Sequence, residues 1–297
     1  MFMHKRIIKS ALVLFLFIVL GFSACMQTRK AVNTDNFPLQ EERFKSLEYD
    51  HRNLGYMHLH RNDTFPTLFF LHGSPSDMSV YNTYYQDSSL AGWANIIAAD
   101  RPGYGKSDAG NSEVSVRRQA RAMWKILEKE GYPSPLYIIG SSYGGTVAAK
   151  MAMQKPGKVD GLVLVSASLA PGMETTYDIS YVIRHSIFRR ILPDKIMVAN
   201  DEKLAHYESL AEMLPLWPEI KAPVIMFQGT RDRLILPENV KFAREKLINS
   251  PYVEYHMLEN ERHFLQLKYK DLILERLRLL AGKKQRSKGN LAGFSEN

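Results

Sequence analysis

The chain has 297 residues, 45% of them hydrophobic, which suits one α/β domain with an insertion or two small domains. The two ends account for six of the eight formal net positive charges, because 32 basic and 30 acidic residues lie between Cys25 and Ala281. Nucleic-acid recognition requires positive charge clustered on a folded face, so this distribution excludes nucleic acid from the expected partners.

The first 24 residues predict a signal peptide. Basic residues through Lys9 precede an apolar run over residues 11–22, which is too short for a comfortable transmembrane helix. The segment Phe22-Ser23-Ala24-Cys25 then resembles a bacterial lipobox. This resemblance implies cleavage before Cys25 and lipidation of its thiol. The protein is therefore expected in the bacterial cell envelope, with the membrane as a partner through the lipid anchor.

Two further segments flank the predicted folded part. Residues 25–40 are polar and lack periodicity, which is typical of a tether. Cys25 is the only cysteine, so no intrachain disulfide can form. The alternative to lipidation is an uncleaved N-terminal membrane anchor with an incidental cysteine. At the other end, residues 282–297 are rich in Lys, Gly, Ser and Asn and predict a disordered basic tail.

Apolar segments between these ends predict the strands of one sheet. Alternation near residues 44–49 and 56–60 predicts an entry hairpin. Mostly apolar runs follow at residues 67–71, 95–99, 136–139, 162–165 and 223–227, and residues 252–258 predict the last strand. Such runs are typical of parallel strands covered on both faces. Helical patterns alternate with them, so residues 41–170 and 222–281 predict a mostly parallel, doubly wound α/β sheet.

The segment over residues 171–221 interrupts this alternation. It carries two apolar stripes at helical spacing, the first over residues 179–191 and the second over residues 204–214. Two helices inserted before the penultimate strand predict a helical cap over the carboxyl edge of the sheet, although an ordinary pair of packing helices gives the same pattern. We expect three aromatic residues of the cap, Tyr181, Phe188 and Trp217, to contact a substrate.

The strand at residues 136–139 leads into a strong functional motif. Residues 140–144 read Gly-Ser-Ser-Tyr-Gly and pass directly into a helical pattern. A serine at such a strand-turn-helix junction projects its hydroxyl from a tight bend, and the flanking glycines relieve the crowding. Ser142 is the predicted nucleophile, and the N–H of Tyr143 lies at the N-terminus of the following helix, where it can stabilise an anion.

A serine nucleophile needs a histidine base that a carboxylate holds in one tautomer. The carboxyl ends of late strands are the place to find both groups. Asp232 follows the strand at residues 223–227, and His263 follows the last strand. Glu174 and Asp178 are alternative acids, because they follow the strand that ends near residue 165.

The chain resembles the α/β-hydrolase superfamily in five segments that occur in the family's order. The segments are His72-Gly73-Ser74-Pro75, residues 100–107 (Asp-Arg-Pro-Gly-Tyr-Gly-Lys-Ser), the turn at residues 140–144, Gly229-Thr230-Arg231-Asp232 and His263-Phe264. The resemblance implies an α/β-hydrolase fold and a triad in which Ser142 is the nucleophile, His263 the base and Asp232 the orienting acid. It also implies an oxyanion hole near Ser74, whose N–H we pair with that of Tyr143 because Pro75 has no N–H.

The expected activity is hydrolysis of a small hydrophobic acyl substrate, most simply a carboxylic ester, through an acyl-enzyme on Ser142. Lactonase, amidase, peptidase, thioesterase and carbon–carbon bond hydrolase activities remain open, because one triad serves them all. A tethered binding protein without turnover is the alternative from another class. No metal or cofactor is expected, since the chain has neither a His-x-x-x-His helix with a carboxylate partner nor a phosphate-binding glycine loop.

Overall fold

The computed structural model describes residues 43–176, 178–185 and 187–292. Within these residues, eight strands form one sheet in the order β1-β2-β4-β3-β5-β6-β7-β8. The strands are β1 (Phe44–Tyr49), β2 (Arg52–Leu59), β3 (Thr67–Leu71), β4 (Asn95–Ala99), β5 (Leu136–Ser141), β6 (Gly161–Val165), β7 (Val224–Gly229) and β8 (Val253–Leu258). The pairs β1–β2 and β2–β4 are antiparallel, and the remaining pairs are parallel. The predicted α/β class and the entry hairpin are therefore confirmed.

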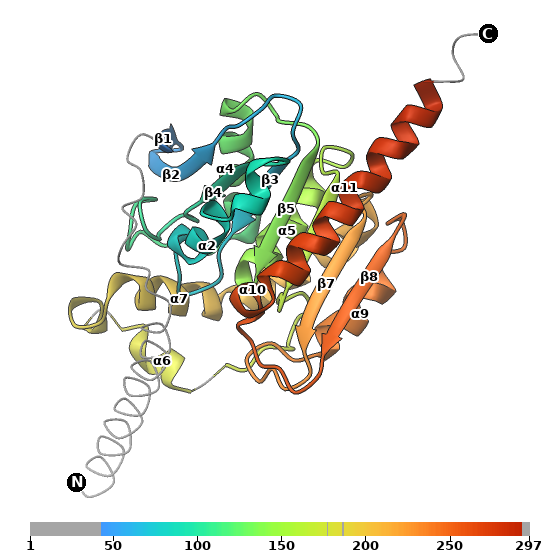
Figure 1. Ribbon diagram of the computed structural model, residues 1–297. Helices are drawn as coiled ribbons and strands as arrows, with labels where there is room; N and C mark the ends of the chain where they lie inside the picture. The colour runs from blue at the N-terminus through green and yellow to red at the C-terminus, as the bar shows by residue number, and fades with distance from the viewer. Residues whose placement is uncertain (1–42, 177, 186, 293–297) are drawn as a thin grey trace, which may run out of the picture. The chain divides into compact units, whose positions relative to one another are not determined.

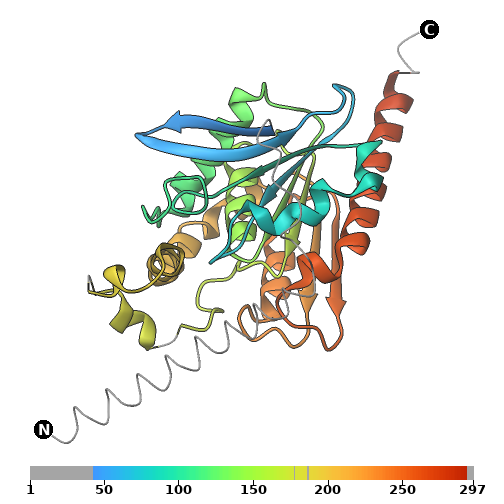
Figure 2. The same ribbon diagram turned by 60° about the vertical axis from the view of Figure 1, so that its left-hand side comes forward.

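Helices cover both faces of the sheet (Figures 1 and 2). One face carries α4 (Val116–Lys129), α5 (Tyr143–Gln154) and α9 (Glu238–Lys246), and the other carries α2 (Asn82–Tyr85) and α11 (Lys270–Ala292). Short helices η3 (Met78–Tyr81), α3 (Ser88–Ala91) and α10 (Leu265–Lys268) complete the connections. Central strands β3 to β7 are buried along their whole length, which explains why their sequences are apolar without alternation.

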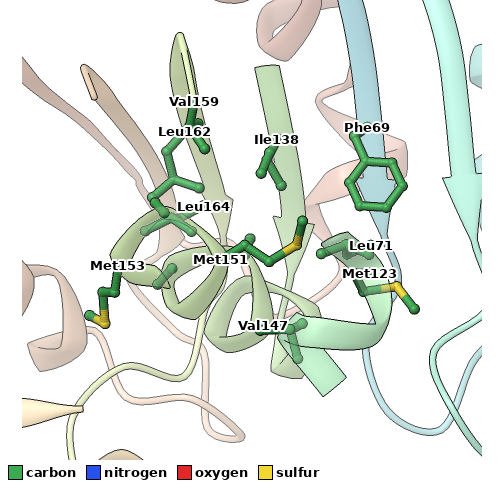
Figure 3. Close-up of a cluster of buried hydrophobic side chains, with 14 of the residues drawn as sticks. Phe69, Leu71, Met123, Ile138, Val147, Met151, Met153, Val159, Leu162 and Leu164 are labelled. Atoms are coloured by element: carbon green, nitrogen blue, oxygen red, sulfur yellow. The ribbon is translucent and has the colours of Figure 1, made fainter. Parts of the chain in front are cut away.

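Packing between α5 and the sheet holds the turn that precedes α5. Figure 3 shows Val147 and Met151 of α5 among the side chains of Met123, Ile138 and Leu164, all fully or almost fully buried. Truncation of such a side chain to alanine costs about 2–5 kcal/mol, because the transfer free energy is lost and a cavity remains. The position of the Ser142 turn therefore rests on the core of the domain.

The cap is helical, as expected, but its helices differ from those predicted. It contains α6 (Ile179–Ile183), η4 (Phe188–Arg190), α7 (Asp194–Leu204), α8 (His206–Ala211) and η5 (Leu214–Glu219). The first apolar stripe thus forms two short pieces, and the longest cap helix, α7, begins directly after its N-cap residue Pro193. The yellow elements α6 and α7 lie beyond the end of the sheet at which the parallel strands finish (Figures 1 and 2).

The remaining predictions concern the two ends of the chain, a disordered C-terminal tail and an N-terminal signal peptide with a tether. Helix α11 continues through Ala292, so residues 282–292 are helical where a disordered tail was expected. Lysine, arginine and glutamine are good helix formers, which explains how the basic segment continues the helix. The predicted signal peptide, the tether and Cys25 lie outside the described residues. None of the helices in the described part is both long enough and apolar enough to cross a membrane.

Candidate active site

Ser142 occupies a strained turn between β5 and α5. Its backbone has φ 53° and ψ −123°, a region that costs a non-glycine residue on the order of 1–3 kcal/mol. The N–H of Ser142 donates to the carbonyl of Val165 at 2.9 Å, which fixes the turn to β6. A side chain at Gly144 would collide with the carbonyl oxygens of Leu71 and His72, so this position requires glycine. The hydroxyl of Ser142 makes no capping hydrogen bond to the helix that follows.

Asp232 and His263 form a hydrogen-bonded pair at the same edge of the sheet. Asp232 follows β7 and His263 follows β8, and 2.7 Å separates Nδ1 of the histidine from Oδ2 of the aspartate. The other carboxylate oxygen accepts the N–H groups of Leu234 at 2.9 Å and Ile235 at 3.0 Å. Burial acts to raise the pKa of Asp232, but the hydrogen bond and charge interaction with His263 and the two N–H groups outweigh it, so this pKa lies below its usual value.

The protonation pattern of this pair follows from the chemistry of its atoms. An ionised carboxylate only accepts hydrogen bonds, so the shared hydrogen resides on Nδ1 of His263. In the neutral ring, Nε2 then has a lone pair available for a proton. Among the hydrogen bonds of residues 43–176, 178–185 and 187–292, none joins Nε2 of His263 to Oγ of Ser142. Hydrogen bonds of this kind are often long without substrate and tighten when it binds.

The segment after β3 lies against Ser142. A methyl group built on Gly73 would lie 3.0 Å from Cβ of Ser142 and 3.6 Å from its Oγ. The next residue along is Ser74, and Tyr143 follows Ser142 directly. In the part of the chain that the structure describes, neither backbone N–H of these two residues donates to a protein acceptor. Two N–H groups on either side of a serine hydroxyl can bind a developing oxyanion.

His72 is a structural residue of this segment. It is fully buried, its Nε2 accepts the N–H of Arg101 at 2.9 Å, and its Nδ1 donates to the carbonyl of Gly73 at 2.7 Å. Burial and the neighbouring Arg101 lower the pKa of His72 to about 3, because both disfavour a charged imidazole. Its ring is therefore neutral at physiological pH and fixes the backbone between β3 and β4.

The alternative acids have other partners. Glu174 contacts His206 Nε2 and Lys203 Nζ, each at 2.6 Å, and accepts a hydrogen bond from Ser168. Burial acts to raise the pKa of Glu174, but the charges of His206 and Lys203 outweigh it and lower the pKa to about 2. Asp178 is exposed at the start of α6. Of the three carboxylates considered, only Asp232 contacts His263 among the described residues.

The three cap aromatics differ in their surroundings. Tyr181 is 53% exposed on α6, and Phe188 is half-buried on η4. Trp217 is fully buried, and its ring packs edge-on against Phe242 of α9 at 5.5 Å between centroids. The contacts of Trp217 thus support core packing, whereas Tyr181 and Phe188 leave surface free for a ligand.

The sequence analysis assigns no role to two residues of the site, Phe264 and Glu202. Phe264 is 58% exposed, and its ring lies 5.4 Å from that of His263, so an apolar surface adjoins the histidine. Glu202 on α7 is fully buried and bonds to Ser74, Arg101, Tyr104 and Gln119. In the sequence Glu202 is one charge in a mixed helical segment, which is typical of a solvated face.

The described residues also bear on metal binding. Among them, no three His, Cys, Asp or Glu side chains lie together in a way that could hold a metal ion. The polar groups at the site are those of acid, base and hydroxyl chemistry.

Comparisons with known proteins agree with this architecture. Residues 66–185 match the family model described as alpha/beta hydrolase fold. An uncharacterised protein of Mycobacterium tuberculosis is 33% identical over 119 residues, which are 40% of this chain and 33% of that protein, so the chain spans about a third of the length of this relative. A 2-hydroxy-6-oxononadienedioate/2-hydroxy-6-oxononatrienedioate hydrolase of Paraburkholderia phymatum is 24% identical, covering 71% of this chain and 86% of that protein.

Solved structures extend the likeness over most of the chain. The crystal structure of a membrane phospholipase A, described as a bacterial virulence factor, is similar with a TM-score of 0.62 and 20% identity. The similarity covers 94% of this chain and 98% of that one. Together with the strand order and the match to the family model, it shows that the chain is an α/β-hydrolase-fold protein.

Proposed function

We propose that the protein is a serine hydrolase that cleaves a small hydrophobic acyl substrate, most simply a carboxylic ester. The observation that carries this proposal is the hydrogen-bonded Asp232–His263 pair, which lies at the same sheet edge as the strained turn of Ser142. A serine after β5, a carboxylate after β7 and a histidine after β8 are the groups that acyl transfer requires.

The proposed reaction has two steps, acylation of Ser142 and hydrolysis of the acyl-enzyme. Nε2 of His263 takes the hydroxyl proton while Oγ of Ser142 attacks the acyl carbon, and the oxyanion that forms accepts the N–H groups of Ser74 and Tyr143. The imidazolium then donates its proton to the departing alcohol, which leaves an acyl group on Ser142. Water repeats the sequence, with His263 first as base and then as acid, and releases the carboxylic acid.

The preference for an apolar substrate rests on two observations. Tyr181 and Phe188 expose aromatic surface in the cap, and Phe264 does so beside His263. Burial of the apolar part of a substrate on such surfaces contributes roughly 25 cal/mol per Å². The phospholipase A that shares the fold supports an ester substrate.

Carbon–carbon bond hydrolysis is the second candidate. The Paraburkholderia relative, a 2-hydroxy-6-oxononadienedioate/2-hydroxy-6-oxononatrienedioate hydrolase whose similarity covers 71% of this chain, supports it. A Ser-His-Asp arrangement is compatible with both reactions, and also with lactone or amide cleavage. A panel that contains aliphatic esters, lactones, peptide amides and a vinylogous 1,5-diketone therefore distinguishes the candidates.

Covalent labelling provides the direct test. A fluorophosphonate probe should modify the parental protein, and peptide mass spectrometry should place the adduct on Ser142. The variant Ser142→Ala should remain unlabelled, whereas Ser141→Ala, which removes the neighbouring hydroxyl of the same motif, should still react at Ser142. A folded parental protein that neither reacts with the probe nor turns over any compound of the panel would support a binding protein without turnover.

A further inference from the structure

We propose that the buried ion pair between Arg101 and Glu202 positions the oxyanion hole, and that the cap thereby completes the site by supplying Glu202. This inference rests on the proposed serine-hydrolase function. Both side chains are fully buried, and 2.5 Å separates Nη1 of Arg101 from Oε1 of Glu202. Arg101 follows β4, whereas Glu202 belongs to α7 of the cap. The pair therefore joins the core to the inserted segment.

Arg101 holds the backbone of the segment that leads to Ser74. Its Nε donates to the carbonyl of His72 at 2.9 Å, and its Nη2 donates to the carbonyl of Gly73 at 3.2 Å. Its guanidinium also lies over the ring of Tyr143, with Cζ 4.6 Å from the ring centroid. One cation thus contacts both the segment that carries one proposed oxyanion donor and the residue that supplies the other.

Glu202 holds the remaining residue of this segment through its side chain. Its Oε2 accepts the hydroxyl of Ser74 at 2.9 Å and that of Tyr104 at 2.6 Å. Its Oε1 accepts Nε2 of Gln119 at 2.8 Å in addition to Arg101. A buried carboxylate with this many donors has a single well-defined orientation, because any rotation leaves a donor unpaired in a low-dielectric interior.

These contacts fix where the N–H of Ser74 points. Oxyanion stabilisation depends on donors that are already oriented toward the developing charge, since reorientation during the reaction costs free energy. Removal of the carboxylate charge leaves Arg101 buried without its counter-ion, and the segment between His72 and Ser74 loses its fixed geometry. Glu202 is accordingly a positioning residue, which acts through Ser74 and Arg101 and does not touch the substrate.

Asp201 offers a matched control on the same helix. Its carboxylate accepts hydrogen bonds from Ser112 at 2.5 Å and from Arg189 at 2.6 Å, so it also links the cap to the core. No bond of Asp201 in the described part of the chain reaches the segment that carries Ser74. A role limited to anchoring the cap predicts similar effects for Asp201→Asn and Glu202→Gln, whereas positioning of the oxyanion hole predicts an effect for Glu202→Gln alone.

The experiment measures kcat and KM on a small activated ester, and the inhibition constant of a trifluoromethyl ketone, which forms a tetrahedral adduct with the serine. In Glu202→Gln, kcat and the affinity for the ketone should fall by roughly 10²-fold, the loss typical of one oxyanion donor, while KM stays near the parental value. Asp201→Asn should leave all three quantities near parental. Ser74→Ala keeps the ion pair and provides a second variant, in which kcat should fall while KM does not change.

The combination of variants separates the explanations. In the double variant Ser74→Ala, Glu202→Gln, kcat should fall by less than the product of the two single effects, because both substitutions alter the hydrogen bond between Ser74 and Glu202. Equal losses of kcat in Asp201→Asn and Glu202→Gln, or a raised KM with parental kcat in both Glu202→Gln and Ser74→Ala, would overturn the inference. Retained ester turnover in Ser142→Ala would contradict the proposed function itself, whereas turnover that depends on Ser142 and not on Glu202 contradicts only the positioning role.

Discussion

Nδ1 of His263 lies 2.7 Å from Oδ2 of Asp232, although 31 positions separate the two residues in the sequence. The contact arises because β7 and β8 are parallel neighbours, so the segments that follow them emerge at the same edge of the sheet. The buried Asp232 holds one tautomer of the imidazole and thereby leaves Nε2 for proton transfer.

The first prediction concerns these residues and Ser142. Ser142→Ala and His263→Ala should each lower kcat by on the order of 10⁴-fold or more, because each removes a group that takes part in bond making or proton transfer. Asp232→Asn should cost somewhat less, because it disturbs only the tautomer and orientation of His263. Steady-state kinetics on the preferred ester measures all three effects.

The same variants contain their own controls. The double variant Ser142→Ala, His263→Ala should be hardly worse than either single variant, since the residues act as one unit. Full activity of Asp232→Asn would mean that another carboxylate orients His263, and Glu174→Gln would then be the next variant to measure. Parental kcat in a folded Ser142→Ala protein would exclude the serine mechanism.

The sequence motifs indicate the candidate site because they depend on local geometry. The Gly-Ser-Ser-Tyr-Gly segment requires a turn in which only glycine fits at residue 144, and the structure has that turn at Ser142. Asp232 and His263 could be predicted from their places after late strands. Such signals survive in a single sequence because each is set by a few neighbouring residues.

The interactions of the cap could not be predicted in the same way. Glu202 meets Arg101 across 101 positions, and nothing in the spacing of the helical segment distinguishes a buried carboxylate from an exposed one. The first apolar stripe predicts one helix, yet the chain forms the short elements α6 and η4. Neither has a buried residue, and a helix gains most of its stability from packing of an apolar face. Trp217 is aromatic and lies in the cap, but its packing against Phe242 depends on the position of α9.

The second prediction concerns the cap aromatics. Tyr181→Ala and Phe188→Ala should change KM and the relative kcat/KM along a series of acyl chain lengths, where one methylene is typically worth about 1–3 kcal/mol. Trp217→Ala should instead lower the free energy of unfolding by about 3–5 kcal/mol, because it leaves a cavity in the core. Kinetics on a chain-length series and denaturant unfolding of each variant measure the two effects. Unchanged preference in both Tyr181→Ala and Phe188→Ala would assign these residues to packing.

The third prediction concerns attachment to the membrane. We propose that the mature protein begins at an acylated Cys25 that carries two or three chains, because one chain gives only marginal binding. In cells that express the full chain, Cys25→Ala should abolish lipid incorporation and leave the precursor unprocessed. Mass spectrometry of the membrane fraction measures both. An unmodified Cys25 with residues 1–24 still attached would favour the uncleaved anchor.

The fourth prediction concerns acid stability and depends on Glu174. The pKa of its carboxyl is about 2 in the folded protein, below the usual 4.5, because His206 and Lys203 outweigh the effect of burial. A lowered pKa means that the folded state holds the proton less tightly than the unfolded state. The resulting stabilisation is complete above pH 4.5 and is lost as the pH falls from 4.5 toward 2.

The size of this loss of stability follows from the difference between the pKa of Glu174 in the folded protein and its usual value. Each pKa unit corresponds to about 1.4 kcal/mol, so the loss between pH 4.5 and pH 2 amounts to at most about 3 kcal/mol. Glu174→Gln should reduce the free energy of unfolding at neutral pH and flatten its decline over that range, as measured by urea unfolding at a series of pH values. Glu208→Gln, which changes an exposed carboxylate on α8, should leave the decline unchanged. A neutral amide at residue 174 cannot lose a charge on acidification. If the free energy of unfolding falls with pH in parallel for the parental protein and Glu174→Gln, the contacts of Glu174 with His206 and Lys203 do not stabilise its ionised form.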